Sequence, residues 1–144
     1  MGDIGSKGGS IQMNPRIEDR GNYIEIVDFY HSLDDERAGN PYNCTFDIRV
    51  SSGGFSGRTD GCEYDYKEWK RFIESLEQLI SFEIKKVSLI EICVGNHIEF
   101  VCDRTGHIII TGEIGSDAGS HFLKFEFRTD QTALQPFIRE LKKL

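Results

Sequence analysis

Polar and apolar residues alternate along several segments of the chain, and this alternation predicts β-strands. In residues 43–50 every second position is apolar, whereas Thr45, Asp47 and Arg49 occupy the opposite face. A period of two is typical of a half-buried antiparallel strand. Residues 121–128 repeat the pattern. Segments rich in β-forming residues, bounded by turn sequences, predict further strands at 23–30, 55–63, 86–94, 98–102 and 107–114.

Two other segments carry apolar residues at helical spacing. The first is a stripe that Trp69 opens, and Asp65 stands before it as a candidate N-cap with Glu68 three residues later. These features predict a helix over residues 66–81, with the indole in the core. A second stripe predicts a helix near residues 131–144. Because proline fits only a first turn, Pro136 leaves three starting points open: Asp130, Thr132 and Gln135.

The order of these elements indicates the class of fold. Strands and helices do not alternate regularly, so we expect an α+β fold with a mainly antiparallel sheet of about six to seven strands. The central and the C-terminal amphipathic helices are expected to pack on one face of that sheet. Residues 1–15 are rich in glycine and serine and show no periodicity, which predicts a flexible leader. Residues 16–144 then form a single domain, in keeping with a chain of 144 residues.

Charge is unevenly distributed. The net charge is −7, and residues 1–66 hold 12 acidic and 6 basic side chains. An acidic field repels nucleic acid and anionic membranes and attracts basic partners. We therefore expect neither nucleic acid nor a membrane as partner, and for the charge alone a role in solubility is the alternative to a basic protein partner. The candidate partner-binding residues are those of a long polar loop and of the outward strand face: Asp34, Asp35, Glu36 and Asp47. A solvated loop without a partner is the alternative.

No catalytic or metal-binding signature is present. Cys93, His97, Cys102 and His107 lack the short ligand pairs of zinc sites, so we expect no metal and no cofactor. Residues 51–59 superficially look like a phosphate-binding loop, but the glycine and lysine positions of that motif are not matched. The sequence shows no secretory signal and no apolar run of about 20 residues, which predicts a cytoplasmic protein with reduced cysteines.

Residues 54–79 and 121–144 carry a resemblance to a known family. A paired strand leads into a helix opening near Glu68 and Trp69, and a Phe125-Glu126-Phe127 strand precedes a closing helix. This arrangement is similar to WapI-type bacterial immunity proteins and to a related uncharacterised bacterial domain. The resemblance implies a non-enzymatic protein that binds and neutralises a cognate polymorphic toxin, often a nuclease. It transfers no contact residues. A small binding or structural domain, and an enzyme whose site is assembled from scattered residues, remain the alternatives.

Overall fold

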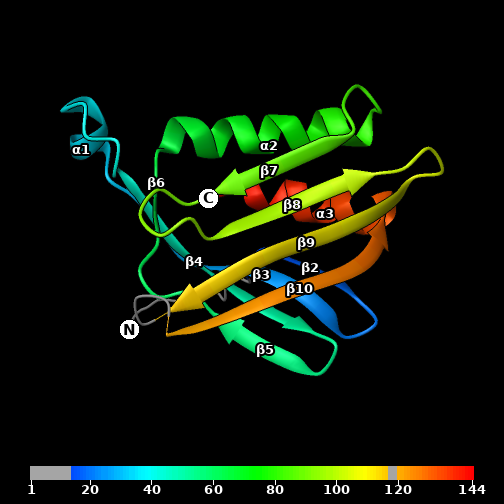
Figure 1. Cartoon of the computed structure of the whole chain (residues 1–144). Coiled ribbons are helices and arrows are strands. Elements are labelled where there is room, and N and C mark those ends of the chain that lie inside the picture. The colour runs from blue at the N-terminus through cyan, green and yellow to red at the C-terminus, as the bar shows by residue number, and fades with distance from the viewer. Residues whose placement is uncertain (1–13, 117–119) are drawn as a thin grey trace, which may run out of the picture.

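The computed structural model describes residues 14–116 and 120–144, which form two antiparallel sheets and three helices (Figure 1). The first sheet contains β2 (Arg16–Asp19), β3 (Asn22–His31), β4 (Cys44–Ser52), β5 (Phe55–Arg58) and β6 (Glu63–Tyr64). The second sheet contains β7 (Lys86–Ile90), β8 (His97–Cys102), β9 (His107–Ser116) and β10 (His121–Asp130). The helices are α1 (Leu33–Arg37), α2 (Tyr66–Ile80) and α3 (Gln131–Leu141).

Both sheets are built mainly from antiparallel neighbours in the chain. The first has the order β2-β3-β4-β5, with β6 also pairing with β4. The second has the order β10-β9-β8-β7, so that each strand lies beside the next one along the sequence. Short turns are sufficient for such connections.

The core lies where the two sheets pack directly on each other, through β10, β5 and β9, and where the two long helices pack against both sheets. Trp69 of α2 is 4.8 Å from the ring of Phe46 in the first sheet, measured between centroids. Phe72, one turn later, is 6.0 Å from Phe100 in the second sheet. The helix α3 contacts β2, β10 and α2. An apolar stripe on each helix is thereby buried against both sheets, which explains why the two stripes are so regular.

The predicted α+β class and antiparallel pairing are confirmed. The described residues form nine strands, divided between two sheets, and α3 packs against strands of both. Alternation along a strand specifies its buried face without specifying which sheet it joins. The cap of α3 is Asp130, one of the three predicted positions.

Three predicted boundaries differ from the structure. The strand β2 is absent from the sequence prediction, because Ile17 is the only apolar residue among its four. Residues 31–42, expected as loop throughout, contain the short helix α1. The strand expected over 86–94 ends at Ile90. Residues 1–13 of the predicted leader lie outside the described residues, and the carbonyl of Pro15 accepts a hydrogen bond from the Ile26 N–H at 2.9 Å.

Candidate partner-binding surface

The arm, defined here as residues 30–43, connects β3 to β4 and projects from one edge of the molecule (Figure 1). The pairing of β3 with β4 shifts between Val27 and Tyr30, and Asp28 has a φ of 57° there. Such a bulge bends a strand and changes the direction in which the chain leaves the sheet. Helix α1 begins beyond the bulge, where the Ser32 hydroxyl accepts a hydrogen bond from the Asp35 N–H at 3.2 Å.

The base of the arm is fixed to the start of α2. Asn43 is buried, and its side chain donates to the Asn40 carbonyl at 2.8 Å and accepts from the Tyr66 N–H at 2.8 Å. The rings of His31 and Tyr66 stack with centroids 3.7 Å apart and planes 9° apart. His31 Nε2 also lies 2.7 Å from Glu36 Oε1. These contacts hold the arm in one orientation relative to α2.

Three of the four predicted partner-binding residues lie together on the arm. Asp34 and Asp35 are exposed on α1, and Glu36 is partly covered by its contact with His31. Three large side chains on the same arm are also substantially exposed: Tyr30, Leu33 and Tyr42. Exposed aromatic residues are enriched at protein interfaces, where they supply much of the binding energy.

Asp47 lies apart from the arm and is buried. Its carboxylate accepts hydrogen bonds from the Thr59 hydroxyl at 2.8 Å and from the Cys62 N–H at 3.3 Å. Arg58 donates to it at 3.2 Å. The alternation in β4 placed Asp47 on the outward face, but the connection between β5 and β6 covers that face. Asp47 therefore holds this connection in place instead of presenting a charge to solvent.

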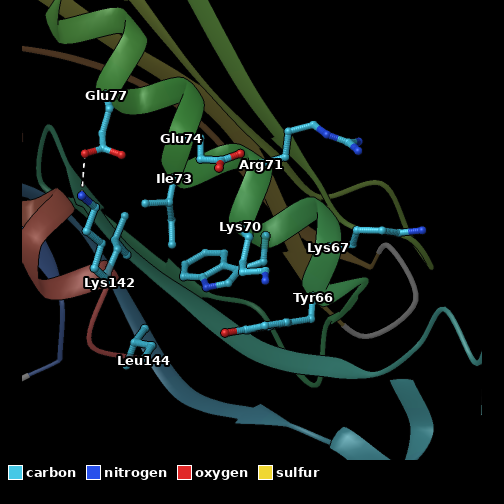
Figure 2. A pocket seen from close by; sticks show the side chains of 11 residues that line it. Tyr66, Lys67, Lys70, Arg71, Ile73, Glu74, Glu77, Lys142 and Leu144 are labelled. Carbon is cyan, nitrogen blue, oxygen red and sulfur yellow. Dashed lines mark hydrogen bonds and ion pairs between the residues drawn. The ribbon is translucent and has the colours of Figure 1, made fainter. Parts of the chain in front are cut away.

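A groove borders the arm at Tyr66 (Figure 2). It has a volume of about 500 Å³ and runs along α2 toward the C-terminus. Lys70 Nζ lies 5.3 Å from the centroid of the Tyr66 ring, and Lys142 pairs with Glu77 across the groove. The lining combines four cations and two carboxylates with an apolar floor. Sequence reasoning missed this site because α2 and the last residues of the chain are far apart in sequence.

The lining of the groove contains no serine, cysteine or histidine that could serve as a nucleophile. The described thiols are not activated either. Burial raises the pKa of Cys44 to about 12, and a hydrogen bond to Glu63 raises the pKa of Cys93 to about 11. A thiol with a raised pKa is largely protonated at neutral pH and is a poor nucleophile.

Other candidate ligands are dispersed. His97 and Cys102 stand at opposite ends of β8, Cys93 lies in the preceding loop, and His107 begins β9. Within residues 14–116 and 120–144, no group of three or more histidines, cysteines and carboxylates is placed to hold a metal ion. Among the same residues, no helix has both the length and the apolar character needed to cross a membrane.

A family model, described as the immunity protein WapI-like family, matches residues 16–144. The chain belongs to the WapI-like immunity protein family. The resemblance inferred from the sequence is thus confirmed, and the match spans the arm, the groove and both sheets. No curated protein matches the chain. A chain in a solved structure of Trypanosoma bruciei MRP1/MRP2 is 12% identical in sequence to this chain and superposes with a TM-score of 0.48. The alignment covers 92% of this chain and 84% of that chain. A similarity this low has no bearing on function.

Proposed function

We propose that this WapI-like protein is a cytoplasmic, non-enzymatic immunity protein that binds a cognate toxin domain through its arm. The toxin surface that meets the arm is basic. One observation carries the proposal: Asp34, Asp35 and Glu36 stand side by side on a projecting arm whose only cationic residue is Arg37. Family membership supports the immunity role, and the charge of the arm supports the choice of a basic partner.

The arm is suited to rapid recognition. Exposed carboxylates attract a basic surface before contact and accelerate association, an effect that salt screens. The contacts of Asn43 and His31 hold the arm in place, so little ordering has to accompany binding. Tyr30 and Tyr42 then offer aromatic surface for the contact itself.

Association kinetics with the purified cognate toxin domain test the proposal. The variant Asp34→Asn, Asp35→Asn, Glu36→Gln keeps the size of each side chain and removes three charges. It should associate about tenfold more slowly at low salt, with a flatter salt dependence and a dissociation rate changed by less than about threefold. The fold should survive, because substitutions at exposed positions such as Asp34 and Asp35 usually change stability by no more than about 0.5 kcal/mol each, and a glutamine at position 36 keeps an oxygen facing His31.

A matched variant separates the arm from net charge. Glu83→Gln, Glu126→Gln, Glu140→Gln removes the same number of charges from the α2–β7 connection, β10 and α3, away from the arm. It should associate nearly as fast as the unmodified chain. Equal slowing in both variants, or none in the arm variant, removes the arm from the interface. Failure of the unmodified chain to bind the toxin or to protect cells from it refutes the proposed function itself.

A further inference from the structure

We propose that the β7–β8 loop, residues 90–96, is the apolar anchor of the toxin interface and enters an apolar pocket on the toxin that is rimmed by basic side chains. The inference rests on the proposed function, because it assigns the same partner to a second element. It concerns a segment that the sequence pattern predicted as part of a strand and that lies outside both the arm and the groove.

The loop exposes an unusual amount of aliphatic surface. Ile90 is 66% exposed, Ile92 is 42% exposed and Val94 is 69% exposed. Single exposed apolar residues are ordinary on protein surfaces, but a group of them within five residues is typical of an interaction site. Burying such side chains in a partner contributes binding energy in proportion to the apolar area removed from water.

The loop is also rigid, because a buried carboxylate organises it from within. Glu91 is 2% exposed. Its side chain accepts hydrogen bonds from the backbone N–H groups of Cys93 at 2.9 Å, Val94 at 2.8 Å and Glu63 at 3.3 Å. The Glu91 N–H donates to the carbonyl of Asn96 at 2.8 Å, which closes the loop. An apolar tip ordered before binding loses little conformational entropy when it is captured.

The loop lies on the same edge of the molecule as the base of the arm. The Ile92 N–H donates to the Glu63 carbonyl of β6 at 3.0 Å. The strand β6 pairs in turn with the start of β4, with Glu63 opposite Thr45, immediately after the arm ends. Figure 1 shows the arm, β6 and this loop along one side of the fold. A single partner can therefore contact the arm and the loop together.

The charge of this edge decides what kind of partner it can accept. Three segments meet there, residues 30–47, 59–66 and 87–97, and together they contain eight carboxylates and a single arginine, with Lys67 and Lys70 of the groove at their border. Asp47 and Glu91 are buried, whereas Asp34, Asp35 and Glu36 stand on the arm and Glu63 contacts the loop through Cys93. Such a surface repels an anionic membrane and also the same edge of a second copy of this chain. It complements a partner with an apolar pocket inside a basic rim.

The double variant Ile90→Ser, Val94→Ser tests the inference with the purified full chain and the same toxin domain. Neither side chain is buried, so the unfolding midpoint should stay unchanged. The complex should dissociate at least tenfold faster, whereas association should change by less than about threefold, because apolar contacts act mainly after encounter. This is the reverse of the kinetic effect expected for the arm variant. Phe55→Ser is the matched control, since Phe55 is 69% exposed on β5 of the same fold and should be neutral.

Cys93 gives a second readout inside the loop. Its thiol is exposed, whereas Cys44, Cys62 and Cys102 are buried, so iodoacetamide should label Cys93 selectively in the folded protein. Bound toxin should slow that labelling at least tenfold. The inference is overturned if the toxin complex of the double variant dissociates at the same rate as that of the unmodified chain, or if bound toxin leaves the labelling of Cys93 unchanged. It is also overturned if the loop mediates a dimer of this chain that the double variant abolishes while toxin binding stays unchanged. Normal toxin binding by the double variant refutes only the loop, whereas no binding by the unmodified chain refutes the proposed function.

Discussion

Replacing Trp69 with alanine tests whether α2 holds the two sheets together. The indole is 1% exposed, and its ring centroid lies 4.8 Å from that of Phe46 and 5.4 Å from that of Phe29. On its other side it lies 5.8 Å from Phe72, which reaches Phe100 of the second sheet. Trp69 therefore occupies the centre of an aromatic chain that crosses from one sheet to the other.

The burial of the indole and these ring pairs determine the expected cost. Truncating a buried tryptophan to alanine costs about 3–5 kcal/mol. Each favourable aromatic pair adds about 0.5–1.5 kcal/mol beyond burial, which places this site in the upper half of that range, at about 4.5 kcal/mol. Native domains are stable by about 5–15 kcal/mol, so the variant loses a quarter or more of its free energy of unfolding. With an m-value of about 2 kcal/mol/M, the urea midpoint falls by about 2 M.

Urea denaturation followed by far-ultraviolet circular dichroism measures this fall. Fluorescence is unsuitable because the chain contains one tryptophan, which the variant lacks. Trp69→Phe should lose about half as much, since it retains part of the ring contacts. Phe55→Ala, at an exposed ring on β5, should change the free energy of unfolding by less than about 0.5 kcal/mol. A midpoint shift below about 0.5 M for Trp69→Ala, with the same m-value, would refute the packing argument.

Two further predictions concern a close backbone approach and a thiol. Gly112→Ala should destabilise the protein by about 3 kcal/mol in urea denaturation, because the added Cβ would lie 2.5 Å from the His97 carbonyl oxygen. Gly57→Ala is the control and should be nearly neutral, because the nearest atom to its added Cβ is 3.7 Å away. Equal effects of the two substitutions would contradict this. Glu63→Gln should accelerate alkylation of Cys93 at pH 8 about tenfold, as measured by mass spectrometry. The reason is that loss of the carboxylate lowers the pKa of the Cys93 thiol from about 11 toward its ordinary value. An unchanged rate would show that Glu63 does not control this thiol.

Local signals account for the parts of the fold that the sequence predicted. The N-cap at Asp65 and the stripe that begins at Trp69 depend on neighbouring residues, and the structure places α2 at Tyr66–Ile80 with Asp65 accepting from the Lys67 N–H. Assignment of strands to two sheets depends on contacts between distant segments, such as the packing of α3 against both β2 and β10. A period of two carries no information about those contacts, so one sheet and two sheets predict the same pattern.

The candidate interface was predictable to the extent that it consists of a run of like charges. Asp34, Asp35 and Glu36 are recognisable as a polar, acidic loop, and they stay together on α1. Asp47 occupies a position of β4 that the alternating pattern predicts to be exposed, but the connection between β5 and β6 covers it. The residues of the β7–β8 loop are mostly apolar, and for that reason their pattern predicts a strand. Glu91 inside that apolar run, with glycine and asparagine just beyond it, is the signal that could have marked a structured loop.

The arm and the loop can perform different parts of the same binding reaction. At physiological ionic strength the Debye length is about 8 Å, so the attraction between exposed charges is strong only at short range and is worth about 1 kcal/mol or less for each exposed pair. Carboxylates such as Asp34 and Asp35 therefore raise the frequency of productive encounters more than they prolong the complex. Slow dissociation requires apolar area removed from water, and Ile90, Ile92 and Val94 supply it on a loop that Glu91 has already ordered. In the proposed interface, the acidic edge accounts for rapid capture of the toxin and the ordered apolar tip accounts for its slow release.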